Sequence, residues 1–248
     1  LISPLKLCHS IEDMYVNEFI ENFSEDNIEV HISKYSRAVI DLNRNLQEID
    51  KRLIADDIKI DADETLKVKS GIGLIPVQTL KGKIIFREKF TKEQFFFLKE
   101  EVYLKWHDLL KKKIDNNLLA FGKVFVIDFH SMPSKYNDSL LPDFVLGNIN
   151  GLSCDNNKLN FISDELKKLG YTVNENYPYS GGYITKKYFN KQKKVETLQV
   201  EINKRLYMNE DQFEKNLKFN KIKEDIAEII KSFMHHLKTD LNIKIAAE

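Results

Sequence analysis

The chain has 248 residues, enough for one sizeable hydrophobic core, and its 38 Lys and Arg residues balance its 38 Asp and Glu residues. The absence of a basic surplus argues against a nucleic-acid partner, and no apolar run approaches the ~20 residues needed to cross a bilayer. Two cysteines, Cys8 and Cys154, are too few for a disulfide scaffold, and no secretory leader is recognisable, so we expect a cytoplasmic protein without a membrane partner.

Runs typical of strands alternate with runs typical of helices along the chain. The predicted strands cover 30–35, 38–42, 123–129, 143–148, 171–176 and a run beginning at 196, with a short apolar piece at 82–86. The predicted helices cover 91–114, 159–169 and 210–238. This alternation predicts an α/β fold in a single domain over residues 1–248, with a mixed central sheet flanked by helices.

Two of the helices have specific sequence signals. Thr91 and Gln94 form a capping box at the start of the first, and Gly170 is expected to end the second. The apolar stripe of the first helix is expected to contain Phe95, Leu98, Val102, Trp106 and Leu109. The stripe of the last helix is expected to contain Phe213, Leu217, Ile226, Ile230, Phe233 and Leu237.

Polar residues that could take part in catalysis or binding stand at four predicted strand ends. They are Arg37 with the run 41–44, the run 128–131, the glycine pair at 181–182, and Glu201. Each has an ordinary structural explanation when taken singly: a surface salt bridge, a hydrogen-bonded histidine, a turn, or a carboxylate that faces solvent. Reactive residues of α/β proteins sit at the carboxyl ends of strands, so the four together favour an active site.

The residue types suit a metal-dependent hydrolase of amides. His130 is a candidate zinc ligand, and Asp128 shares its face of a strand, where it can orient the imidazole ring. Glu201 can act as a general base, and Arg44 can hold a substrate carboxylate. Zn²⁺ is the expected cofactor, and a small acidic molecule is the expected substrate.

Further metal ligands are expected near the N-terminus. His9 and Glu12 stand three residues apart, so both side chains can reach one metal ion from a turn, and Asp13 is an alternative acid. The remaining histidines are expected to have structural roles. They are His31, His107, His235 and His236.

Seven motifs in order make the chain resemble the N-formylglutamate amidohydrolase (N-formylglutamate deformylase) family. They are EDMYVNEF (12–19), SRAVIDLNR (36–44), GIGLIP (71–76), VFVIDFHSMPS (124–134), PDFVLGNINGLSCD (142–155), NYPYSGGYIT (176–185) and LQVEINKRLYM (198–208). The resemblance implies a zinc-carboxypeptidase-like or zinc-exopeptidase-like α/β fold, shared with the aspartoacylases. It also implies hydrolysis of N-formyl-L-glutamate to formate and L-glutamate, a reaction of histidine degradation.

The resemblance also implies roles for individual residues. Zinc would be held by His9, Glu12 and His130, and Glu201 would be the general base. Arg37 would stabilise the oxyanion. The substrate would be bound by Asn43, Arg44, Gly181, Gly182 and Tyr183.

Two alternative functions remain open at this point. One is a zinc carboxypeptidase-like peptidase, in which the run 41–44 would bind a carboxylate of the peptide in the same way. A relative that binds acidic ligands without turnover is the other alternative. It is motivated by the run LCHSIEDMY (7–15), in which His9 lacks the preceding Pro and following Gly that the family usually has.

Overall fold

The computed structural model describes residues 8–21, 23, 28–56, 58–79, 82–86, 88–136 and 138–245. The expectation about a secretory leader and Leu7 of the run LCHSIEDMY concern residues 1–7, which lie outside this description. The fold groups into two compact units, each built from separate stretches of chain. The first comprises Leu1–Met14, His31–Val126 and Gly182–Glu196, and the second comprises Tyr15–Val30, Ile127–Gly181 and Thr197–Glu248.

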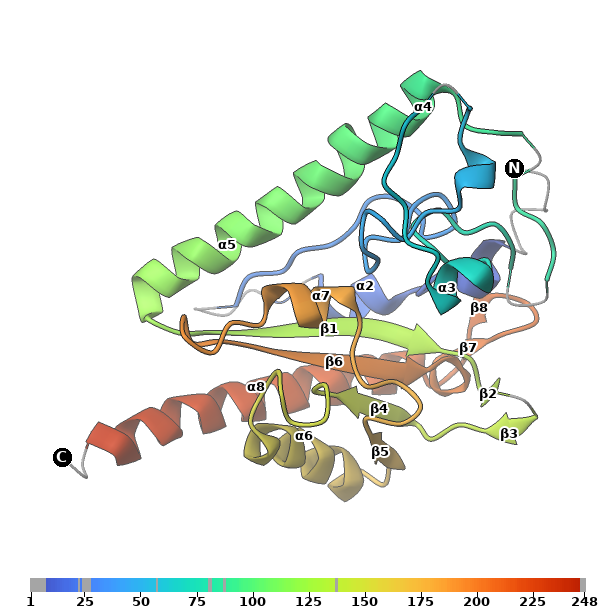
Figure 1. Cartoon of the computed structure of the whole chain (residues 1–248). Coiled ribbons are helices and arrows are strands. Elements are labelled where there is room, and N and C mark those ends of the chain that lie inside the picture. The colour runs from blue at the N-terminus through green and yellow to red at the C-terminus, as the bar shows by residue number, and fades with distance from the viewer. Residues whose placement is uncertain are drawn as a thin grey trace. The chain divides into compact units, whose positions relative to one another are not determined.

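The elements follow one another in the order shown in Figure 1. The helices are η1 (His9–Ile11), α2 (Val16–Ile20), η2 (Lys51–Leu53), α3 (Leu66–Lys69), α4 (Lys92–Phe96), η3 (Phe97–Leu104), α5 (Lys105–Phe121), α6 (Asn156–Lys168), α7 (Tyr183–Tyr188), η4 (Lys204–Leu206) and α8 (Phe219–Ile245). The strands are β1 (Val124–Met132), β2 (Lys135–Tyr136), β3 (Ser139–Leu140), β4 (Phe144–Gly147), β5 (Val173–Glu175), β6 (Val195–Asn203), β7 (Met208–Asn209) and β8 (Glu214–Lys215). In the part of the chain that the structure describes, none of the helices has the length and apolar composition needed to span a lipid bilayer.

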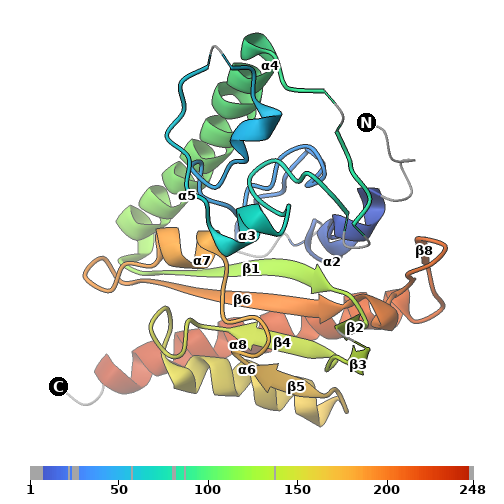
Figure 2. The ribbon, with the colours of Figure 1, turned by 45° about the vertical axis from the view of Figure 1, so that its right-hand side comes forward.

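A four-stranded sheet in the order β1-β6-β4-β5 forms the core of the second unit (Figure 2). Strand β4 pairs parallel with β5 and antiparallel with β6, so the sheet is mixed, as predicted. Strand β4 is apolar and buried over its full length, and β6, which mixes apolar and polar residues, is buried everywhere except at the half-buried Glu196. The register places Val145 opposite Glu201, which fixes the face on which the Glu201 side chain lies.

Helices α6 and α8 pack on each other beside this sheet. The rings of Phe161 and Phe233 lie 6.0 Å apart, and Ser232 donates a hydrogen bond to Glu165. The Tyr171 hydroxyl, next to β5, donates to Asp225 of α8. Helix α6 ends as predicted, with Gly170 at a φ of 89° directly after it.

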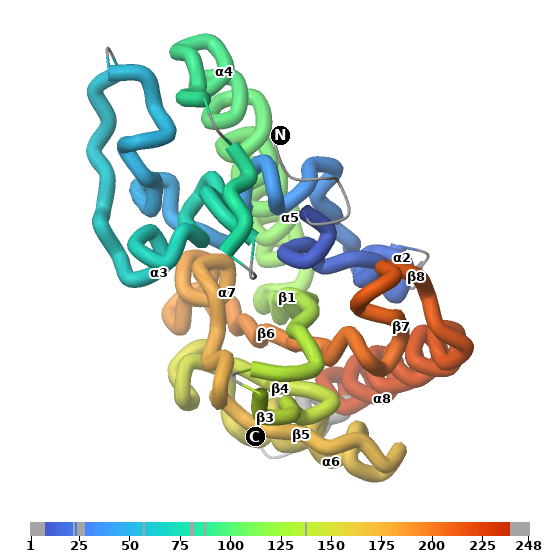
Figure 3. Tube along the Cα trace, turned by 90° about the vertical axis from the view of Figure 1, so that its right-hand side faces the viewer, coloured from blue at the N-terminus to red at the C-terminus, as the bar shows by residue number. Residues whose placement is uncertain are grey.

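The first unit is built on one long helical run formed by α4, η3 and α5. The predicted capping box of Thr91 and Gln94 is present at its start. Its middle segment, η3, is a π-helix of eight residues, which the sequence did not predict. Figure 3 shows the segment 31–90 as a blue-to-teal tube with few helical turns beside this run. Apolar residues of both parts form the core of the unit. They are Ile40, Leu42, Ile49, Leu53, Ile54, Leu74, Ile75, Phe95, Leu98, Val102 and Tyr103.

The structure corrects several predicted elements. Neither 30–35 nor 38–42 forms a strand. In the second run, the amides of Val39 and Ile40 donate to the Ser36 carbonyl and form a turn. The long helical run continues to Phe121, and the last helix begins at Phe219 instead of residue 210.

Two residues of the predicted apolar stripes are exposed. The π-helix shifts the helix face by about one residue, so that Leu109 is exposed and Leu110 is buried instead. Leu217 is exposed because it precedes the last helix. The strand β1 is half-buried over its apolar part, and only its end, from His130 to Met132, is buried.

Candidate active site

A tight turn in the first unit carries the run Asp41–Arg44. The Asp41 amide donates to the Leu74 carbonyl at 2.7 Å, which anchors the turn to a neighbouring segment. The Asn43 amide donates to Oδ1 of Asp41 at 2.9 Å, so the Asp41 side chain also closes the turn. These two hydrogen bonds therefore fix the backbone conformation from which the side chains of this run project.

The buried carboxylate of Asp41 holds two guanidinium groups. Nε of Arg37 donates to its Oδ2 at 2.8 Å, and Nη2 of Arg44 lies 3.4 Å from the same oxygen. Burial alone would raise the pKa of Asp41, but the charges and hydrogen bonds of Arg37 and Arg44 outweigh it and hold that pKa below its usual value. Asp41 is thus an ionised anchor that orients both arginines. No role for Asp41 is evident from the sequence.

The two arginines differ in exposure. Arg44 is buried, because its Nε donates to the Ile72 carbonyl and its Nη1 to the Asn43 carbonyl, each at 2.9 Å. Burial lowers the pKa of Arg44, while the charge of Asp41 opposes that shift. The side chain of Arg37 is 27% exposed, and its Nη1 donates to Asp13 at 3.2 Å. Arg37 is therefore the more accessible cation of the pair.

Two side chains of the long helical run hold the carbonyl groups of this turn. The Tyr103 hydroxyl donates to the Arg44 carbonyl at 2.7 Å, and His107 Nε2 lies 3.1 Å from the Leu42 carbonyl. A carbonyl can only accept, so the proton of the His107 ring is on Nε2, and Nδ1 faces the Tyr188 hydroxyl at 2.8 Å. Burial, followed by the charge of Lys187, lowers the pKa of His107 to about 3, so this imidazole is neutral at pH 7. Its predicted structural role is supported by these contacts.

The amide side chain of Asn43 packs directly on Gly182. The Ile184 amide donates to Asn43 Oδ1 at 2.8 Å. A Cβ atom on Gly182 would lie 2.3 Å from Nδ2 of Asn43, so only glycine fits at this position. Three predicted substrate-binding residues, Asn43, Gly182 and the neighbouring Tyr183, are therefore brought together. Gly181 belongs to the second unit.

The two N-terminal ligand candidates lie on one turn of the first unit, as their spacing predicts. His9 begins η1, and Glu12 is the residue that follows this helix. The carboxylate of Glu12 accepts a hydrogen bond from the Ser36 hydroxyl, next to Arg37. Asp13, the alternative acid, is the partner of Arg37 described above.

The second unit holds the other two catalytic candidates on neighbouring strands. His130 is buried at the end of β1, and its Nε2 lies 3.1 Å from Oδ2 of Asp128, as the two-residue spacing predicts. Glu201 of β6 is also buried, so the alternative in which it faces solvent is wrong. Gln199 Nε2 donates to its Oε1 at 3.0 Å and fixes the carboxylate.

The donor chemistry of the candidates suits zinc, but the described part of the chain contains no group of three or more His, Cys, Asp or Glu placed to hold a metal ion. The contact between His130 and Asp128 does match the way in which zinc-bound imidazoles are oriented by a carboxylate. Two of the other histidines pack on aromatic rings: His31 against Trp106 at 4.6 Å, and His236 against Phe161 at 4.2 Å.

Comparison with known proteins gives concordant matches. A family model described as N-formylglutamate amidohydrolase matches residues 2–208. The N-formylglutamate deformylase of Pseudomonas putida is 29% identical over 207 residues, covering 80% of this chain and 71% of that protein. The N-formylglutamate deformylase of Pseudomonas aeruginosa is 28% identical over 204 residues, covering 78% and 68%. The crystal structure of N-formylglutamate amidohydrolase from Ralstonia eutropha JMP134 has the same fold, with a TM-score of 0.86, 24% identity, and coverage of 96% of this chain and 88% of that one.

Replacing Asp41 with Asn is expected to destabilise the protein by about 3–5 kcal/mol, because two arginines would lose their buried counter-charge. The folded pKa of Asp41 is depressed, so its contribution exists above the unfolded pKa and is lost as pH falls through the folded pKa. Urea unfolding at pH 7 and at acid pH measures both effects. Asp56→Asn, at an exposed site, is the control and is expected to cost less than about 1 kcal/mol; an equal cost for both variants contradicts the anchoring role.

His107→Gln is expected to flatten the pH dependence of stability between about pH 6.5 and about pH 3. The folded pKa of His107 is about 3 and lies below its ordinary 6.5, so the unfolded state binds the extra proton and wild-type stability falls as pH falls through this window. In His107→Gln, the slope of the free energy of unfolding against pH across this window should decrease by up to about 1.4 kcal/mol per pH unit. The exposed His235→Gln is the matched control, and an unchanged slope in His107→Gln would refute the prediction.

Proposed function

Because the chain belongs to the N-formylglutamate amidohydrolase family, we propose that it hydrolyses the amide bond of an N-acylated acidic amino acid, with N-formyl-L-glutamate as the leading substrate. The observation that carries the proposal is the family match over residues 2–208, a range that includes every candidate site residue. The products would be formate and L-glutamate. The zinc-carboxypeptidase-like ancestry implied by the motifs is part of the same proposal.

In the proposed reaction, Glu201 is the general base. A water molecule adds its oxygen to the formyl carbon, Glu201 accepts the proton of that water, and the carbon–nitrogen bond breaks as Glu201 passes the proton to the leaving amine. The buried position of Glu201 and its hydrogen bond from Gln199 support this role, because both keep the carboxylate in one orientation.

Arg37 is proposed to stabilise the oxyanion that develops on the formyl oxygen. Donors aimed at the developing charge accelerate amide hydrolysis most when they are oriented before the substrate arrives. Asp41 and Asp13 orient Arg37 in this way, and the partial exposure of its side chain leaves it accessible.

Asn43 and Arg44 are proposed to bind the α-carboxylate of the substrate, together with Gly181, Gly182 and Tyr183. The guanidinium of Arg44 is fixed by three internal contacts, so little side-chain entropy is lost when a carboxylate binds. The close packing of Asn43 on Gly182 allows backbone of this segment to approach a ligand.

His9, Glu12 and His130 are proposed to hold a zinc ion, with Asp128 orienting the ring of His130. When bound, zinc would supply Lewis-acid activation of water and of the formyl oxygen. The imidazole and carboxylate donors of these residues support the assignment.

Glu201→Gln is expected to lower kcat for N-formyl-L-glutamate by at least about a hundredfold, because the amide cannot accept the proton of the attacking water. Formate release from the zinc-supplemented protein is the measurement. Glu175→Gln, an exposed change on β5, is the control. A fully active Glu201→Gln variant overturns the mechanism, and a wild-type protein inactive on this substrate overturns the substrate assignment.

The purified protein is expected to contain stoichiometric zinc, which elemental analysis measures directly. His130→Ala should lose this metal, since it removes a proposed ligand, whereas the exposed His235→Ala should retain it. Wild-type protein that binds no zinc when supplied with it would favour the alternative of a relative that binds acidic ligands without turnover.

A further inference from the structure

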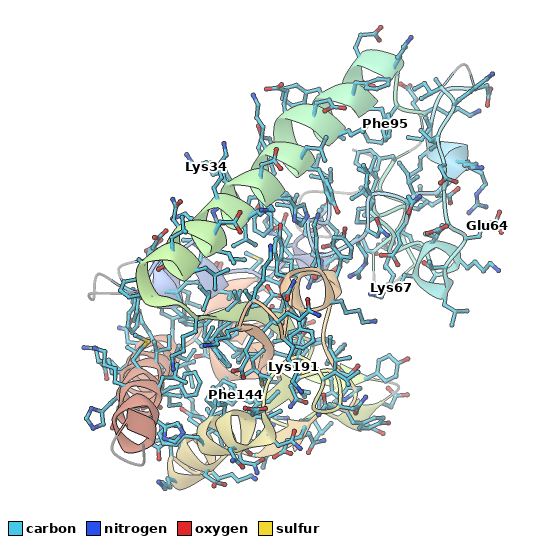
Figure 4. The ribbon with its side chains drawn as sticks, turned by 60° about the vertical axis from the view of Figure 1, so that its left-hand side comes forward. Lys34, Glu64, Lys67, Phe95, Phe144 and Lys191 are labelled. Atoms are coloured by element: carbon cyan, nitrogen blue, oxygen red, sulfur yellow. The ribbon has the colours of Figure 1, made fainter. Side chains whose placement is uncertain are left out.

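The short helix α3 carries a half-buried lysine, Lys67, in the first unit. Figure 4 places Lys67 on the side of α3 that faces α7, the helix that follows Gly182. Thr65 caps α3 by accepting from the Val68 amide, which fixes the start of the helix. Lys67 is therefore held on an ordered element beside the proposed substrate-binding residues.

A short chain of hydrogen bonds connects the backbone of Lys67 to the guanidinium of Arg44. The Ile72 amide donates to the Lys67 carbonyl at 2.9 Å, and the Ile72 carbonyl accepts from Arg44 Nε at 2.9 Å. Ile72 thus links the backbone of α3 directly to the guanidinium of Arg44.

The surroundings of the Lys67 ammonium are unfavourable to its charge. Burial is the largest cause that lowers the pKa of Lys67, and repulsion from Arg44 comes next. Glu48 and Asp41 oppose the shift through their negative charge, and Lys186 of α7 adds further repulsion. Among the residues that the structure describes, none forms a hydrogen bond or ion pair with the Lys67 ammonium.

The nearby carboxylates already have other partners. Asp41 pairs with both arginines of the turn. Glu48 accepts from the Asn45 amide at 3.0 Å and from the Thr65 hydroxyl at 3.1 Å. Lys67 is thus a partly desolvated cation. Neither Asp41 nor Glu48 forms an ion pair with its ammonium.

We propose that Lys67 binds the side-chain carboxylate of the substrate and so determines specificity for dicarboxylic N-acyl amino acids. The inference rests on the proposed function, which assigns the α-carboxylate to Arg44 and Asn43. A substrate with two carboxylates offers a second negative charge, and Lys67 supplies a second cation from a helix whose backbone is linked to Arg44 through Ile72. A bound carboxylate would relieve both the repulsion from Arg44 and the desolvation of the ammonium.

The test measures equilibrium binding of L-glutamate and L-glutamine by calorimetry, since these ligands differ only in the side-chain charge. The wild-type protein should bind glutamate roughly tenfold or more tightly than glutamine, the effect of one charge-assisted contact. Lys67→Met should reduce this ratio to near one by weakening glutamate alone. Lys67→Arg should keep most of the ratio, and Lys69→Met, an exposed change of the same charge on the same helix, should keep all of it.

Binding and turnover separate the two proposals. Loss of the glutamate preference in Lys67→Met supports the role of Lys67 even if N-formyl-L-glutamate is not hydrolysed, in which case the proposed function alone fails. A Lys67→Met variant that keeps the preference overturns this inference, whatever the activity. A wild-type protein that binds both ligands equally, or neither, overturns it as well. Thermal unfolding of each variant confirms that the comparison is made between folded proteins.

Discussion

The buried carboxylate of Asp41 sets the direction of two guanidinium groups and closes the turn that carries them. Its ionised form depends on both arginines, because burial alone would favour the protonated acid. The same arrangement makes the arginines unequal: Arg44 is enclosed by carbonyl groups, while Arg37 keeps part of its side chain exposed. One anchoring charge therefore holds one enclosed and one accessible guanidinium, which suits the roles proposed for them in binding a carboxylate and stabilising an oxyanion.

This turn also depends on the long helical run, and that dependence could not be predicted from periodicity. The predicted face of the helix follows a repeat of 3.6 residues and reaches Leu109. The π-helix in its middle displaces the later residues, so His107 and Leu110 are buried instead. Tyr103 and His107 consequently reach the carbonyls of Arg44 and Leu42. Because a π-helix has no reliable sequence signal, the contacts of Tyr103 and His107 with this turn were not predicted, although a structural role for His107 was.

Locally determined features of the fold were predicted well. Strands β1, β4, β5 and β6 follow from apolar runs bounded by turns, and the contact between Asp128 and His130 follows from the two-residue period of a strand. The run 38–42 has the same apolar character, yet its amides bond to Ser36 and Leu74 and it forms turns. The anchoring of the Asp41–Arg44 turn and the proposed role of Lys67 likewise depend on the distant segment 72–74, through the Leu74 and Ile72 carbonyls, which composition and spacing do not reveal.

The positive charges of Arg44 and Lys67 make this part of the molecule less favourable to folding, and a bound ligand would explain why they are retained. Burial of Arg44 and Lys67 beside each other opposes folding, and the pKa of each is lowered by desolvation. Proteins retain such local conflicts mainly at functional sites, where other parts of the fold compensate for them. A monocarboxylate at Arg44 would leave the Lys67 charge uncompensated, whereas a dicarboxylate would neutralise both. The proposed preference for an acidic side chain thereby rests on the charges of this chain and not on the family resemblance alone.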